Sequence, residues 1–178
     1  MAAGILRAAT SLRETGETMA TNERLPAHTP RCFGCGDDNP CGLGLEGWRD
    51  GDEVRGRVTF GKHHSGGPMF AHGGAVATAL DDCLGMLLYV IQTPAVTARL
   101  ETDYRKPVLL NTEYGLHAWM TGREGRKMWA AIDMRDADGQ VVAEGKGLFL
   151  TVTIDHFTKD LPDDWRERAK DMGLDLPW

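Results

Sequence analysis

Residues 73–92 read GGAVATALDDCLGMLLYVIQ, and this stretch decides the fold. Its length and residue types favour an α-helix. Apolar side chains occur nearly all the way round that helix, and a helix of this kind is buried and not laid on a surface. The sequence therefore predicts a central helix that forms the core of the protein.

Segments with the pattern of β-strands lie on both sides of this helix. Residues 54–60, VRGRVTF, alternate apolar and polar side chains with the two-residue period of a half-buried strand. Four further runs after Pro94 read as strands: 95–108, 113–122, 127–136 and 141–152. Asp138-Gly139 is a strong signal for a hairpin turn between the last two. An antiparallel sheet with one apolar face can cover such a helix, so we predict an α+β fold.

The totals limit the organisation and the partners of the chain. Its 178 residues suit a single core, and we predict an N-terminal arm over 1–30, one domain over 31–154 and a C-terminal tail with a short helix over 155–178. The formal net charge of −6 argues against nucleic acid and anionic membranes as partners. Neither a secretory signal nor a membrane-spanning segment is evident, so we expect a cytoplasmic protein.

Two features of the predicted helix point to chemistry. Asp81 and Asp82 are its only charged residues, and burying an ionised carboxylate costs several kcal/mol unless it is paired. At its start, His72-Gly73-Gly74 leaves backbone N–H groups open at the positive end of the helix dipole, where an oxyanion would be stabilised. Either carboxylate could instead be solvated or capped, and the glycines could serve helix–sheet packing alone.

The spacing of these features has a consequence for assembly. Asp81 follows Gly73 by eight residues, which is about 12 Å along one helix at ~1.5 Å per residue. One reacting carbonyl group cannot touch both. If both act on one carbonyl, they come from two subunits related by a two-fold axis.

Three motifs resemble the hotdog-fold thioesterase superfamily, and more narrowly its PaaI-like and human thioesterase-superfamily-member branches. The first is HGGAVATALD at 72–81, the second is the Cys- and Gly-rich stretch at 32–43, and the third is TARLETDYRKP at 97–107. The resemblance covers roughly residues 31–153. It implies a sheet wrapped round the helix, a homodimer or homotetramer with interfacial sites, and hydrolysis of acyl-CoA, in which coenzyme A is part of the substrate and no cofactor is needed.

The resemblance also implies roles for single residues. Asp81 is the expected nucleophile or general base, and Gly73 is the expected amide donor to the thioester oxygen. His72 and Thr97 would assist, and Gly74 would contact the substrate. Some relatives carry an asparagine just before the His-Gly-Gly motif, and this chain does not. We therefore expect water to be positioned by one of three other residues: Asn39, His64 or Thr97.

Other candidates have weaker signals. Arg105 and Lys106 are expected to bind coenzyme A phosphates, and Arg123, Arg126 and Lys127 are further candidates. The C-x-x-C pair in the glycine-rich loop suggests zinc, but a closed site needs four ligands, and only a distant Cys83 or a histidine could complete it. We therefore predict free thiols and no metal.

Two other functions remain open on the sequence. A hotdog hydratase or dehydratase acting on acyl thioesters needs a histidine and an acidic residue facing one substrate carbon, and GGPMFAHGG at 66–74 is faintly similar to such a loop. A non-catalytic acyl-CoA-binding protein is the second. It explains the buried carboxylate less well, because an apolar ligand does not require one.

Overall fold

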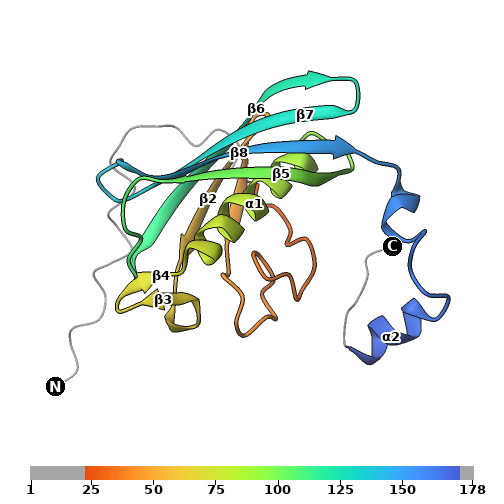
Figure 1. Cartoon of the computed structure of the whole chain (residues 1–178), viewed down its shortest axis with the longest axis horizontal. Coiled ribbons are helices and arrows are strands. Elements are labelled where there is room, and N and C mark those ends of the chain that lie inside the picture. Colours follow the sequence, from red (N-terminus) through yellow and green to blue (C-terminus); the bar gives the residue numbers. More distant parts are fainter. Residues whose placement is uncertain (1–22, 173–178) are drawn as a thin grey trace.

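A six-stranded antiparallel sheet wraps around one long helix (Figure 1). The computed structural model describes residues 23–172. The sheet has the order β1-β2-β6-β7-β8-β5, and a separate two-stranded sheet pairs β3 with β4. The elements are β1 (Glu46–Asp50), β2 (Glu53–Thr59), the 3-10 turn η1 (Lys62–His64), β3 (Ser65–Gly67), β4 (Phe70–Ala71), α1 (Gly73–Val90), β5 (Ala95–Tyr104), β6 (Glu113–Glu124), β7 (Lys127–Arg135), β8 (Val141–Thr151), η2 (Ile154–Phe157) and α2 (Trp165–Asp171).

Helix α1 is the core element, as the sequence predicted. Leu80, Leu84 and Leu87 of this helix have no exposed surface, and they meet one face of the sheet. The strands alternate accordingly: Val54 and Val58 of β2 face the helix, while the residues between them are more exposed. By length and hydropathy α1 could also span a membrane, but 56% of it is buried in the fold, as befits a core helix. The predicted α+β hotdog arrangement is confirmed.

The sequence missed three strands. No strand was predicted before residue 54, yet Glu46–Asp50 forms β1 at the edge of the sheet. Only Gly47 of this strand is buried, so no apolar alternation marks it. A Cβ at Gly47 would lie 2.3 Å from the Met86 sulfur, which shows how closely α1 approaches. The strands β3 and β4, three and two residues long, are too short to carry a periodic signal.

The edge at β1 is covered by the chain just before it. Leu25 N donates to Gly47 O at 2.9 Å, and Arg49 N donates to Glu23 O at 3.1 Å. Leu25 is itself buried. Part of the predicted arm therefore packs on the domain, and residues 1–22 lie outside the described residues. The short helix expected in the tail is α2, and residues 173–178 again lie outside the described range.

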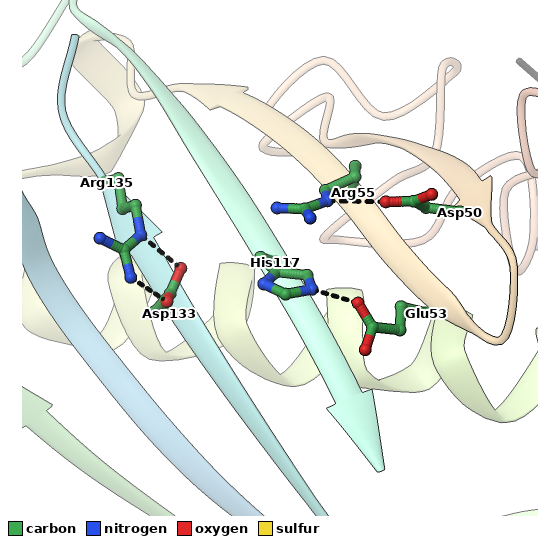
Figure 2. A network of polar contacts seen from close by, with 6 residues as sticks. All are labelled: Asp50, Glu53, Arg55, His117, Asp133 and Arg135. Carbon is green, nitrogen blue, oxygen red and sulfur yellow. Dashed lines mark hydrogen bonds and ion pairs between the residues drawn. The ribbon is translucent and has the colours of Figure 1, made fainter. Parts of the chain in front are cut away.

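The outer face of the sheet carries charged pairs (Figure 2). His117 Nε2 lies 2.6 Å from a Glu53 carboxylate oxygen on the neighbouring strand. Arg135 donates to both oxygens of Asp133, at 3.1 and 2.6 Å. His117 is thus a partly buried surface residue of the face opposite α1.

The packing of α1 generates a stability prediction. Leu84→Ala should lower the free energy of unfolding by about 2–5 kcal/mol, because it removes a fully buried side chain and leaves a cavity. Leu161→Ala is the matched control, since that side chain is 43% exposed, and it should change stability by less than about 0.5 kcal/mol. Urea unfolding measures both, and equal effects would contradict the central position of α1.

Candidate active site

Asp81 faces the edge strand β5. The Thr97 hydroxyl donates a hydrogen bond to Asp81 Oδ1 at 3.0 Å. Asp81 is half-buried and Thr97 is exposed, so the pair lies at the margin of the fold, where a ligand can reach it. No hydrogen bond is recorded for Asp81 Oδ2 within residues 23–172, which leaves this oxygen available to a water or substrate. The structure therefore brings together two residues that the sequence assigned to one site, and their catalytic roles stay predictions.

A β-bulge places Thr97 on the helix side of its strand. The pairing of β5 with β8 shifts register between Thr97 and Arg99, which leaves Ala98 without an opposite residue. A bulge of this kind redirects the side chains that precede it. In a regular strand Thr97 and Tyr104, seven positions apart, would point to opposite faces. The bulge brings both side chains to the same face, where both contact α1.

The start of α1 presents one free amide. His72 is the N-cap residue, and its Nδ1 accepts a hydrogen bond from Gly74 N at 2.9 Å. The Tyr104 hydroxyl donates to Gly73 O at 2.8 Å. No acceptor is recorded for the Gly73 N–H among the described residues. Gly73 can therefore offer its amide to an oxyanion, whereas the amide of Gly74, a predicted substrate contact, already has a partner in His72.

Asp81 and Gly73 cannot meet on one substrate within a single chain. They lie on the same helix, about two turns apart, with Thr97 beside one and Tyr104 beside the other. Two hollows in the described part of the chain lie elsewhere. One is beyond the end of α1 against Ile91 and Met120, and the other is under residues 24–27.

Asn39 and His64, two candidates for positioning water, have hydrogen-bond partners within the chain. Asn39 Oδ1 accepts from Cys41 N at 3.0 Å, and its side-chain amide donates to Arg31 O. His64 is buried; its Nδ1 accepts from Gly61 N at 2.9 Å, and its Nε2 lies 3.2 Å from Cys41 O. The side chains of both residues already have internal partners, so of the three candidates only Thr97 contacts Asp81.

The predicted phosphate ligands are paired with acidic residues. Arg105 Nε donates to Glu144 at 2.9 Å, and this bond raises the pKa of the exposed guanidinium. Lys106 lies 3.7 Å from Asp136. Phosphates would have to displace these partners. Arg123, Arg126 and Lys127 lie at the other end of the sheet, about 25 Å away at ~3.3 Å per residue of β8.

Asp82 points away from Asp81, into a polar cluster that the sequence did not predict. Its Oδ1 lies 3.1 Å from His28 Nδ1 and 3.2 Å from Cys32 Sγ. Cys35 Sγ in turn lies 3.2 Å from His28 Nδ1. His28 was assigned to the arm and Asp82 was considered only beside Asp81, so no sequence pattern joined them. Cys83, which we weighed as a ligand, instead packs towards Gly56 of the sheet.

These contacts shift the pKa values of the cluster. The hydrogen bond with Asp82 is the main cause that raises the pKa of His28 to about 10. Burial raises the pKa of Asp82, but its bonds to His28 and the thiols outweigh burial and hold that pKa below its usual value. The hydrogen bond with Cys35 lowers the pKa of Cys32 to about 5, whereas the pKa of Cys35 is raised by the same bond and by burial. The cluster therefore holds two groups that favour their anionic forms, Asp82 and Cys32, beside a protonated His28.

Comparison with known proteins agrees with this fold and motif. The thioesterase superfamily model matches residues 70–143, from β4 into β8. Acyl-coenzyme A thioesterase THEM4 of Rattus norvegicus is 31% identical over 96 residues, which are 53% of this chain and 41% of the relative. The chain thus spans less than half of this curated relative.

Solved structures show the same arrangement. Protein RHA08564, a thioesterase superfamily protein, superposes with a TM-score of 0.64 at 32% identity, over 68% of this chain and 60% of that one. The PaaI protein of E. coli has a TM-score of 0.59 at 16% identity, over 62% of this chain and 81% of that one, and shows the fold alone. The resemblance expected from the three sequence motifs is confirmed: residues 70–143 match the thioesterase superfamily model, and the fold is that of solved hotdog-fold thioesterase superfamily proteins.

Proposed function

We propose that this protein is an acyl-CoA thioesterase that hydrolyses its substrate at sites shared by two subunits. Two features of α1 carry the proposal. Asp81 accepts a hydrogen bond from Thr97, and the N–H of Gly73, the first residue of the helix, has no recorded partner among the described residues. The name of the THEM4 relative supports acyl-CoA as the substrate class. The acid and free coenzyme A are the expected products, and no cofactor is required.

The proposed chemistry uses the two groups in complementary roles. The Gly73 amide polarises the thioester carbonyl and stabilises the negative charge that develops on its oxygen. Asp81 acts on the carbonyl carbon, either directly or by taking a proton from an attacking water. In the water route the new C–O bond forms, the C–S bond breaks, and the proton reaches the departing coenzyme A thiolate. Thr97 holds one carboxylate oxygen so that the other faces the substrate.

The edge strand β5 supports a dimer. Within the described sheet, β1 at one edge is covered by residues 23–25, whereas β5 at the other edge is ten residues long and mostly exposed. A long exposed edge strand is a template for pairing with another chain. We propose that β5 pairs antiparallel with β5 of a second copy.

This pairing explains how separated groups can form one site. Thr97 marks the Asp81 end of β5 and Tyr104 marks the Gly73 end. When Thr97 of one chain lies opposite Tyr104 of the partner subunit, Asp81 of the first chain approaches Gly73 of the partner subunit. The two-fold axis repeats the pairing, so a dimer has two sites.

Replacing Asp81 tests the carboxylate. Asp81→Asn should fold normally and lower kcat/KM for acyl-CoA by roughly 10²–10⁴-fold, because the amide cannot accept a proton or attack. Asp138→Asn, at an exposed hairpin turn, is the matched control and should leave turnover unchanged. Thiol release from short, long and aromatic acyl-CoAs is the measurement. Wild-type-like turnover in Asp81→Asn rejects the proposal, and enoyl-CoA hydration without thiol release would favour a hydratase.

Replacing Gly73 tests the amide. Gly73→Pro removes the N–H at the first helical position, where proline is well tolerated, and His72 already has an extended backbone with φ −64° and ψ 136°. We expect a folded protein with kcat reduced by roughly 10²–10³-fold, as for loss of one oxyanion donor. Gly73→Ala keeps the N–H, and its Cβ would sit an ordinary 3.4 Å from the Tyr104 hydroxyl. Equal activity of the Pro and Ala variants would remove the amide from the mechanism.

A further inference from the structure

Four side chains outside the proposed catalytic site form a compact set of metal-ligating groups. They are His28, Cys32, Cys35 and Asp82, and their ligating atoms all lie within 4.8 Å of one another. Three come from the loop before β1, and Asp82 comes from the middle of α1. The proposed hydrolysis uses none of them.

The backbone around the cluster is shaped to bring these groups together. A Cβ at Gly34 would lie 2.2 Å from the Asp82 carboxyl carbon, so only glycine lets the carboxylate enter the loop. Gly85, one turn along α1, leaves similar room for the His28 ring, 3.0 Å from the position of its Cβ. His28 N donates to Cys35 Sγ at 3.2 Å, a bond that favours a thiolate. The cluster is therefore built by the fold.

One atom of the cluster lacks a partner. Asp82 is only 10% exposed, and its Oδ2 is a buried oxygen with no hydrogen bond among the described residues. Leaving a buried charged oxygen without a hydrogen bond is energetically unfavourable. A cation bound among the four groups could coordinate this carboxylate and balance its charge.

We propose that His28, Cys32, Cys35 and Asp82 bind one zinc ion in a closed tetrahedral site. Zinc takes bonds of about 2.3 Å to sulfur and about 2.0–2.2 Å to nitrogen and oxygen, which places neighbouring ligand atoms about 3.3–3.8 Å apart. The distances of 3.1 and 3.2 Å between neighbouring groups are close to this spacing, so small side-chain adjustments suffice. Two sulfurs, one imidazole and one carboxylate suit zinc. Zinc binding requires two thiolates and a neutral imidazole, so it displaces the protons that the cluster still carries on these groups.

The site would be structural. Four protein ligands fill a tetrahedral shell and leave no open position for a substrate or water. The ion would tie the loop at 28–35 to α1 at the residue next to Asp81. Loss of the metal should therefore lower stability first and alter turnover through the position of the helix. The proposal does not depend on the thioesterase function.

Metal analysis of the full chain, purified without a histidine tag, tests the site. Plasma mass spectrometry should find about one zinc per chain in wild-type protein, while a Cys32→Ser/Cys35→Ser variant should retain less than about a tenth of that. Cys41→Ser is the matched control, because this exposed cysteine lies outside the cluster, and it should keep wild-type zinc. Asp82→Asn should weaken zinc retention against a chelator by more than about tenfold.

X-ray absorption at the zinc edge on wild-type protein keeps the test decisive even if the double variant fails to fold. The expected shell has two sulfurs at about 2.3 Å and two lighter atoms at about 2.0 Å. The proposal would be overturned by folded wild-type protein that takes up no zinc after reconstitution, by a shell without sulfur, or by full zinc retention in the double variant. A Cys32–Cys35 disulfide in freshly purified protein would also overturn it.

Discussion

Two adjacent carboxylates on a buried helix are the constraint on which the structure depends. Successive residues of α1 differ in direction by about 100°, so Asp81 and Asp82 must leave the helix towards different neighbours. Asp81 meets Thr97 on the edge strand, and Asp82 meets His28 and Cys32 in the loop. Each carboxylate thus connects one part of the fold to the core helix, and the two carboxylates lie in separate surroundings.

Much of the fold could be predicted from the sequence because its signals are local. Apolar residues all round the segment at 73–92 predicted the helix, alternation predicted β2, and the four runs after Pro94 predicted β5, β6, β7 and β8. The strand β1 could not be predicted, because its one buried residue is a glycine. The missing side chain of this glycine leaves space for α1 but gives no hydrophobic signal. The packing of the segment at 23–28 on the domain could not be predicted either, because it depends on hydrogen bonds to that strand.

The candidate site could be predicted in part. The motif from His72 to Asp81 does open α1 and extend along it, and Thr97, which the sequence placed in the same site, is the hydrogen-bond partner of Asp81. The bulge that turns Thr97 towards Asp81 has no sequence signal. Asn39 and His64 looked available but are held by backbone groups. The four-residue cluster joins side chains 54 positions apart, and the short-range C-x-x-C pattern revealed only half of it.

The central claim is that one site takes Asp81 from one chain and the Gly73 amide from the other. Heterodimers of an Asp81→Asn chain and a Gly73→Pro chain, co-expressed with two different tags and purified through both, test it directly. One of their two sites is complete, so thioesterase activity should return to about half that of the wild-type dimer, although each parent is nearly inactive. Heterodimers no more active than the parents would show that the two groups do not meet across an interface.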